Sequence, residues 1–194
     1  MNKEHVLLCV LGRTSCGKDT LVKKLRERTG LTSITSYTTR KRRNNEGNTH
    51  IFSDIETYRQ MQENGNVAAY TEIAGNYYWT TTDQLYEHSI YIIDPCGVET
   101  LRKLNLPNLR LVTVYINTPD DIRRDRAINQ RGDDRLTFAK RDMAERDQFK
   151  AMLRNADFDY AVSNIDASRA YSVLRWIAIV EGAWKNNLKE EEEC

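Results

Sequence analysis

Glycine, lysine and hydroxyl side chains gather near the amino terminus, in the order Gly12-Arg13-Thr14-Ser15-Cys16-Gly17-Lys18-Asp19-Thr20. Glycine lets backbone N–H groups curl around a polyphosphate, and a lysine at this spacing reaches its β and γ oxygens. The stretch therefore predicts a phosphate-binding loop, and the alternative is a ligand-free turn between a strand and a helix. A hydroxyl that meets Mg²⁺ usually follows the lysine. Here that residue is Asp19, so Asp19 and Thr20 are both candidate magnesium ligands.

A second cluster that suits phosphate lies at residues 36–46, where Arg40, Arg42 and Arg43 are close together. A guanidinium group binds phosphate oxygens through two parallel hydrogen bonds. The cluster therefore predicts a second anion site. By itself, such a basic run is also typical of a nucleic-acid-binding patch or of a solvated loop.

A third stretch, residues 123–154, is rich in arginine and in acidic residues, and its sparse apolar points include Leu136, Phe138 and Met143. This composition predicts helices that are thinly anchored to the core. Since a bound phosphate attracts arginine, we interpret the stretch as a mobile lid over the phosphate-binding loop. The alternative is a solvated helical face whose charges pair with one another.

The elements that must position these residues follow from four apolar runs of the buried parallel-strand type, at residues 6–11, 90–93, 111–116 and 160–163. Helical patterns lie between the runs. Their boundaries are signalled by Gly30, by the capping box at residues 53–56, by Thr118-Pro119, and by Asp166 for a last helix ending near Trp184. The alternation predicts an α/β fold with a right-handed parallel sheet that binds ligands at the carboxyl ends of its strands.

Length and composition narrow the class of protein. The chain has 194 residues, which suits one domain, and its 29 basic and 28 acidic side chains create no overall field toward nucleic acid or a membrane. Its four cysteines show no Cys-x-x-Cys spacing, which favours reduced thiols over a metal framework. The sequence has neither a cleavable leader pattern nor an apolar run of about 18 residues. These features predict a soluble, unprocessed protein of the cytoplasm.

Several motifs together resemble the guanylate kinase family: the loop at residues 12–20, Ser36 with Thr38-Thr39-Arg40, Arg43, Glu46, Gly75-Asn76-Tyr77-Tyr78 and Asn164. The resemblance runs from about residue 6 to residue 170. It implies an α/β fold, a three-layer P-loop kinase with a parallel central sheet, an inserted nucleoside-monophosphate-binding segment and a helical lid. Within this single domain the core would comprise residues 1–32, 81–122 and 156–188, the monophosphate-binding segment residues 33–80, and the lid residues 123–155.

The resemblance also implies which residues bind the two nucleotides. The acceptor monophosphate would be held by Arg40, Arg43 and Tyr78. Ser36 would meet the six-position of the base, and the other substrate-binding positions are Glu46, His50, Thr80 and Asp94. ATP would be bound by Gly12, Ser15, Cys16, Gly17, Lys18, Asp19, Thr20, Arg126 and Asn164, the last near the adenine. The implied catalytic residues are Lys18, Arg40, Arg131 and Arg141, and the implied cofactors are ATP and Mg²⁺.

Three positions depart from the pattern of the family. His50 stands where a second tyrosine touches the monophosphate, Ala69 replaces the glutamate that reads the base, and Ile92 replaces an aspartate two residues before Asp94. Guanine presents two neighbouring N–H donors that suit a carboxylate, which Ala69 does not offer. We therefore predict a weakened preference for GMP, with a deoxynucleotide or another or modified base as a candidate acceptor.

The predicted function is ATP-dependent phosphoryl transfer to a nucleoside monophosphate, GMP, dGMP or a related nucleotide, by a monomer or homodimer. Two facing anion sites suit this reaction because it needs alignment and charge neutralisation more than a catalytic base. One alternative is a binding module of the same shape that has lost catalysis, although Lys18 and the arginines of residues 123–155 are present. The other is a nucleic-acid-binding protein using residues 40–43, which the nearly neutral charge disfavours.

Overall fold

The computed structural model describes residues 4–42, 50–73 and 75–185. Its core is a four-stranded parallel sheet in the order β6-β1-β7-β8. The central strand is β1, in which Leu8 lies opposite Ile90 of one neighbour and Val112 of the other. The four strands are β1 (His5–Leu11), β6 (Ile90–Ile92), β7 (Leu109–Asn117) and β8 (Tyr160–Ser163). The parallel α/β core expected from the apolar runs is confirmed.

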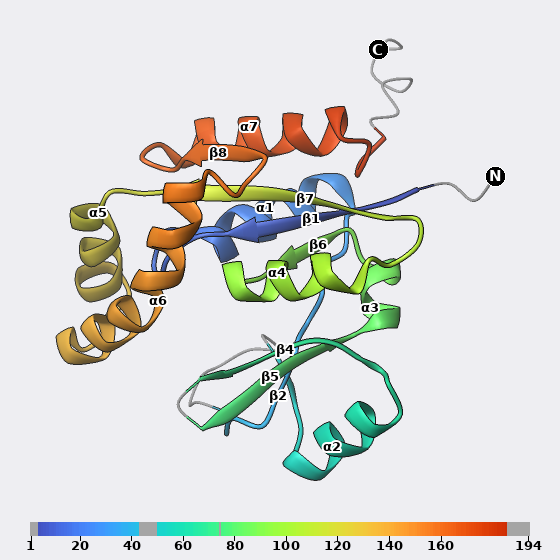
Figure 1. The fold of residues 1–194 in the computed structure, drawn as a ribbon. Coiled ribbons are helices and arrows are strands. Elements are labelled where there is room, and N and C mark those ends of the chain that lie inside the picture. The colour runs from blue at the N-terminus through green and yellow to red at the C-terminus, as the bar shows by residue number, and fades with distance from the viewer. Residues whose placement is uncertain (1–3, 43–49, 74, 186–194) are drawn as a thin grey trace.

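Each face of β1 is buried because successive side chains point to opposite sides of the sheet. Val6, Leu8 and Val10 pack with α1 (Lys18–Thr29) and α7 (Ala167–Val180). The alternate residues, among them Leu7 and Cys9, pack with α4 (Pro95–Leu104) and the carboxyl-terminal part of α6 (Arg135–Asn155). The result is three layers, with helices on both faces of the sheet (Figure 1). The predicted helix stop is also confirmed, since Gly30 caps α1 with a φ of 73°.

A second, smaller sheet lies below the core in Figure 1. Its order is β3-β2-β5-β4, from β2 (Tyr37–Thr38), β3 (Ile51–Phe52), β4 (Val67–Ile73) and β5 (Asn76–Thr81). One helix, α2 (Ile55–Glu63), packs on it through Tyr58, which contacts the fully buried Trp79. The chain returns to the core through α3 (Thr82–Glu87). A helix is therefore present where the capping box at residues 53–56 predicted one.

Residues 120–155 form α5 (Asp120–Asp125), the π-helical turn η1 (Arg126–Gln130) and the long helix α6. The helical character is as predicted, but the apolar anchors differ. Phe138 is buried, whereas Leu136 and Met143 are 70% and 66% exposed. The anchors that sequence reasoning missed are Phe149 and Met152, which the last turns of α6 bring against the sheet.

Two predicted helix starts are wrong by one position. α2 is capped by Asp54 rather than Ser53, because the Asp54 carboxylate accepts the backbone N–H of Thr57 at 2.7 Å. α5 begins after Pro119, which is its N-cap residue rather than its first helical residue. The hydroxyl of Thr118 is used elsewhere, since it donates to the carbonyl of Cys16 at 3.0 Å.

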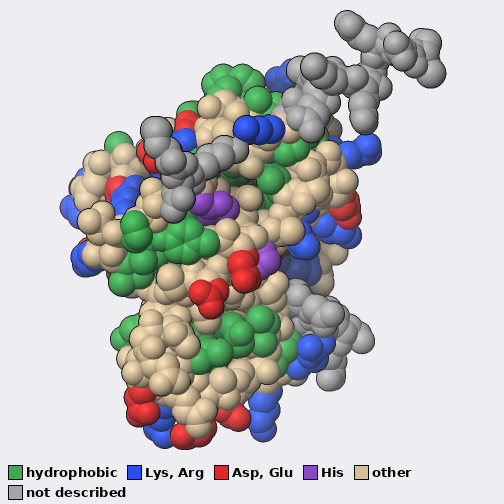
Figure 2. Space-filling view, turned by 90° about the vertical axis from the view of Figure 1, so that its right-hand side faces the viewer, with side chains coloured by type: hydrophobic (Ala, Val, Ile, Leu, Met, Phe, Trp, Pro, Cys, Tyr) green, Lys and Arg blue, Asp and Glu red, His purple; other side chains and the backbone are tan. Residues whose placement is uncertain are grey.

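Charges of both signs share the surface. In Figure 2, which views the molecule from the right-hand side of Figure 1, Lys and Arg side chains are interspersed with Asp and Glu. This face therefore presents no broad field of one sign that would attract nucleic acid. Among the helices of the described ranges, none combines the length and apolar character that crossing a bilayer requires.

Candidate functional site

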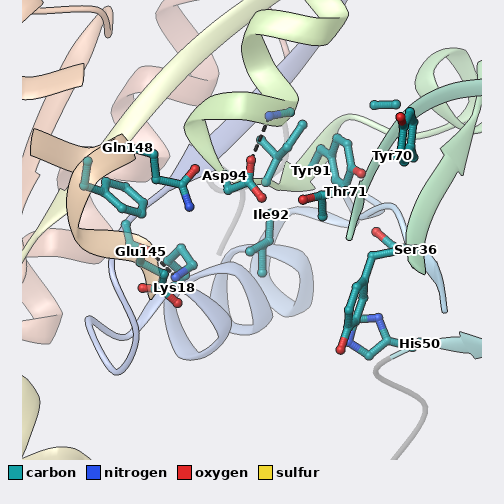
Figure 3. A pocket seen from close by; sticks show the side chains of 16 residues that line it. Lys18, Ser36, His50, Tyr70, Thr71, Tyr91, Ile92, Asp94, Glu145 and Gln148 are labelled. Atoms are coloured by element: carbon teal, nitrogen blue, oxygen red, sulfur yellow. Dashed lines mark hydrogen bonds between the residues drawn. The ribbon is translucent and has the colours of Figure 1, made fainter. Parts of the chain in front are cut away.

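Two cavities meet at Lys18, which lines both of them. The first, here called the cleft pocket, has a volume of about 350 Å³ and lies between the core and the small sheet (Figure 3). The second, here called the loop pocket, has a volume of about 640 Å³. It is lined by Ser15, Cys16, Gly17, Lys18, Asp19, Thr20, Leu21, Arg126, Gln130, Arg131, Asn164 and Ala167. The glycine-rich loop therefore separates two spaces that each have room for a ligand.

The loop is held in place by Asn164 and Arg126. Asn164 is 2% exposed and donates from Nδ2 to the carbonyl of Cys16 at 2.7 Å, while Arg126 donates to the Asn164 carbonyl at 2.8 Å. Gly17 makes this packing possible. It has a φ of 94°, and a Cβ there would collide with the Asn164 amide. Both predicted donor-site residues thus lie at the loop, where they also support its backbone.

Lys18 crosses the loop, donating from Nζ to the carbonyl of Gly12 and to that of Arg13 at 3.5 Å. Its positive charge is therefore fixed between the two pockets. Asp19 and Thr20 follow in the first turn of α1 and are exposed in the loop pocket. No group of three or more His, Cys, Asp or Glu residues capable of holding a metal occurs within the described ranges. Asp19 and Thr20 nevertheless offer the hard oxygens that Mg²⁺ accepts alongside phosphate and water.

The two predicted catalytic arginines of the lid segment, Arg131 and Arg141, contact the same carboxylate. Arg131 donates to Asp133 through Nε at 2.9 Å and reaches Ser15 Oγ at 3.0 Å, whereas Arg141 lies 3.7 Å from Asp133. Asp133 is largely buried, with a side-chain exposure of 17%. The structure therefore places Arg131 in the lining of the loop pocket. Arg141 lies beside Asp133 and lines neither pocket.

A network of ion pairs that sequence reasoning missed ties the loop to α5 and α6. Arg13 donates to Asp142 at 2.7 Å and to Asp120 at 3.2 Å. Arg123, whose side chain is 2% exposed, contacts the same carboxylates at 2.8 and 2.7 Å and also donates to the Thr14 carbonyl at 3.0 Å. These partners are more than a hundred positions from the loop in sequence, so no local pattern could have identified them.

Two carboxyl groups lie at the border of the cleft pocket with the loop. Glu145 of α6 accepts the backbone N–H of Thr14 at 2.6 Å, and Asp94 caps α4 by accepting the N–H of Gly97 at 2.7 Å. Burial raises the pKa of both carboxyl groups, while the positive charge of Lys18 lowers it. Asp94 was expected to line this pocket, but Glu145 was not identified from the sequence.

The far wall of the cleft pocket comes mainly from the small sheet. Ala69 and Thr71 of β4 line it, whereas Glu72 is exposed and does not. Ser36 lines the pocket beside Tyr91, and a hydrogen bond between the two opposes the increase in the Tyr91 pKa that burial causes. The remaining polar residues of this wall are Tyr70, His50 and Tyr78, and the rings of the last two meet edge to face at 5.6 Å.

Two of the predicted acceptor residues that the structure describes do not line the cleft pocket. Thr80 is fully buried and does not line the cleft pocket, because its hydroxyl donates to Gln84 Oε1 at 2.7 Å. Arg40 lies over the ring of Phe52 at 5.5 Å, next to His50 but outside the lining of the pocket. Arg43 and Glu46 lie outside the described residues.

Comparison with known proteins gives one family. The family model described as guanylate kinase matches residues 3–178. The chain is 31% identical over 187 residues to a guanylate kinase of Nitratidesulfovibrio vulgaris, covering 92% of this chain and 88% of the relative. It is 28% identical over 185 residues to one from Chlamydia muridarum, covering 90% and 87%. Among solved structures, guanylate kinase from Anaplasma phagocytophilum matches with a TM-score of 0.63 and 22% identity, covering 93% of this chain and 88% of that one.

Proposed function

The chain belongs to the guanylate kinase family and is a nucleoside monophosphate kinase. We therefore propose that it transfers the γ-phosphoryl group of ATP to GMP, dGMP or a related nucleotide. One observation carries the proposal: Lys18 lines both the loop pocket and the cleft pocket. A phosphoryl group that passes from ATP in the loop pocket to an acceptor in the cleft pocket would be stabilised by this fixed positive charge.

The loop pocket suits ATP. As a P-loop, residues 12–20 would surround the phosphates with backbone N–H groups. Arg131 would then bind phosphate oxygens in place of the Asp133 carboxylate. Asn164 Oδ1 is buried without a hydrogen-bond donor in the described chain, and the amino group of adenine would supply one. Mg²⁺, held by Asp19 or Thr20 with the phosphates, would neutralise charge that develops during the transfer.

The cleft pocket suits the acceptor. Ser36 and Asp94 would contact the base, while Tyr78, His50 and Arg40 would approach its phosphate from the small sheet, with Arg43 supplied from outside the described residues. Residues 33–80 would therefore act as the monophosphate-binding segment, residues 123–155 as the lid, and the remainder as the core. Closure of these parts would exclude water and so prevent hydrolysis of ATP.

The free cysteines, the position of Lys18 and the nearly neutral charge favour a cytoplasmic kinase over the two alternative functions. Cys9, Cys16 and Cys96 are all free thiols, which suits a reducing compartment. A binding module that had lost catalysis would not need the Lys18 charge between two pockets. A nucleic-acid-binding protein would need a basic field that the nearly neutral chain lacks.

The test is a coupled assay of ATP against a panel of ribonucleoside and deoxyribonucleoside monophosphates. We expect turnover with at least one purine nucleotide, and a loss of about 10² to 10⁴-fold in kcat for Lys18→Ala, because a preorganised charge at the transferring group is removed. GMP binding, measured by calorimetry, should survive in this variant. The matched control is Lys150→Ala, which changes an exposed lysine on α6 outside both pockets. Turnover by Lys18→Ala within a few-fold of the parent would exclude the loop pocket as the donor site.

A further inference from the structure

The lysine, aspartate and glutamate side chains that line the cleft pocket have partners within the protein. Lys18 donates to carbonyls of the loop, Glu145 accepts the N–H of Thr14, and Asp94 accepts the N–H of Gly97. An incoming nucleoside must therefore compete for these groups or use others.

Gln148 is the exception among the pocket residues that come from α6. Its Oε1 is buried and has no hydrogen-bond donor among the residues that the structure describes. Its amide points into the cleft pocket, across from Asp94 and above Lys18 (Figure 3). A buried carbonyl oxygen without a donor is costly, because it has lost its water and gained nothing in return. A ligand that brings an N–H or O–H group to this point removes that cost.

The backbone of α6 is anchored on both sides of Gln148. Phe149, the next residue, is buried against the sheet, and Glu145, one turn earlier on the same face as Gln148, is hydrogen-bonded to the loop. The helix that carries the amide is therefore fixed at this point. A fixed backbone lowers the cost of ordering the side chain when a partner binds.

From this geometry we propose that Gln148 is a specificity-determining residue of the acceptor site, whose amide carbonyl accepts a hydrogen bond from an N–H or O–H group of the acceptor nucleoside. The inference rests on the proposed function, since it takes the cleft pocket as the acceptor site. It adds a residue of α6 to the residues of the small sheet that would recognise the nucleoside. It also assigns discrimination between nucleotides to a neutral amide, in a pocket where β4 contributes Ala69, Tyr70 and Thr71 and no carboxylate.

The group that would meet the Gln148 carbonyl is one hydrogen-bond donor of the nucleotide, and guanosine monophosphate carries four candidate donors. They are the N1–H, the 2-amino group, the 2′-hydroxyl and the 3′-hydroxyl. Four analogues each lack one of them: 1-methyl-GMP, IMP, dGMP and 3′-deoxy-GMP. Measuring the same substitution against all five nucleotides therefore identifies which group meets Gln148.

The substitution is Gln148→Met, which keeps the length of the side chain and removes its hydrogen-bonding groups. We expect kcat/KM for GMP to fall by about tenfold, the usual worth of one buried hydrogen bond. The analogue that lacks the donor bonded to Gln148 should already be a poorer substrate of the parent enzyme. The substitution should not lower kcat/KM for that analogue any further. The other three analogues should lose as much as GMP does.

The matched control is Lys150→Met, which alters an exposed side chain two positions further along α6. Thermal unfolding of both variants checks that the fold is retained. An equal loss for all five nucleotides would overturn the proposal, because Gln148 would then only shape the pocket. The absence of any loss would overturn it as well.

Calorimetric titration of the same nucleotides without ATP separates this inference from the proposed function. If the parent phosphorylates none of them and no nucleotide of the coupled-assay panel either, the proposed function fails. The binding constants still test Gln148 in that case, since loss of affinity confined to the nucleotides that keep the donor would support its role. If the parent phosphorylates GMP and the variant shows no selective effect, only the inference fails.

Discussion

At the scale of single residues, the cleft pocket differs from a guanine site built on carboxylates. The β4 residues that line it are Ala69, which is 3% exposed, Tyr70 and Thr71, while Glu72 is exposed and outside the lining. The pairing of β4 with β5 shifts between Val67 and Ala69, but this irregularity does not turn Glu72 inward. The carboxyl groups that line the pocket are Asp94, which caps α4, and Glu145 of α6, so neither comes from the small sheet.

The predicted consequence is a weak preference for GMP that Ala69→Glu would strengthen. A carboxylate at this position would add a charge-assisted hydrogen bond worth about 1.5 to 3 kcal/mol, or roughly 10 to 150-fold in kcat/KM for GMP over AMP. Glu72→Ala, which alters the exposed face of the same strand, should leave this ratio unchanged. A parent enzyme that already prefers GMP by more than about 10³-fold over every other nucleotide would contradict the prediction.

At the scale of elements, α6 supports the loop. Asp142 receives both Arg13 and Arg123, and its side chain is 13% exposed. We predict that Asp142→Asn lowers the free energy of unfolding by about 2 to 4 kcal/mol, because the buried Arg123 loses a charged partner and retains only Asp120. Urea denaturation measures this change. Asp147→Asn, on the exposed side of α6, should change stability by less than about 0.5 kcal/mol. Equal effects of the two substitutions would rule out a supporting role for Asp142.

The other link between α6 and the loop depends on pH. Burial holds the pKa of Glu145 above its usual value, so the folded chain binds this proton more tightly than the unfolded chain does. The stability that the proton contributes is complete below the unfolded pKa of about 4.3 and is lost as the pH rises through the folded pKa.

Glu145→Gln tests this link because it keeps an acceptor for the Thr14 N–H and removes the titrating group. We expect the variant to gain stability relative to the parent between pH 4 and pH 7, as measured by the difference between their urea midpoints. A difference that is constant over this interval would show that Glu145 has an ordinary pKa in the folded chain, and one that shrinks as the pH rises would show a lowered pKa.

At the scale of the whole molecule, the two pockets meet at one lysine and are built from distant parts of the chain. A compound that joins adenosine to guanosine through a polyphosphate should occupy both pockets at once. At 100 times its Kd it would stabilise the fold by about 2.7 kcal/mol. We therefore predict a larger rise in Tm than with equal concentrations of ATP or GMP alone. A rise no larger than that with ATP would mean that the pockets do not act together.

Much of this architecture follows from local patterns in the sequence. The apolar runs predicted the strands of the core because a strand buried on both faces needs nearly continuous apolar residues. The spacing of Gly12, Gly17 and Lys18 predicted the loop, because glycine alone tolerates the φ of 94° and the close approach of Asn164 at Gly17. The helix ends were less certain, since neighbouring polar residues such as Ser53 and Asp54 compete to cap one helix.

The sequence by itself determined the family, the order of the core strands and helices along the chain, and the loop with its lysine, since each depends on residues close together in the chain. Only the tertiary structure decided which side chains face the pockets. Glu145 lies 131 positions from Thr14, and the inward direction of Gln148 depends on how α6 packs on the sheet. Thr80 carries the same hydroxyl as Thr71 and is buried against Gln84, while Thr71 faces the cleft. Residue type does not determine exposure, because burial depends on contacts that only the folded chain brings together.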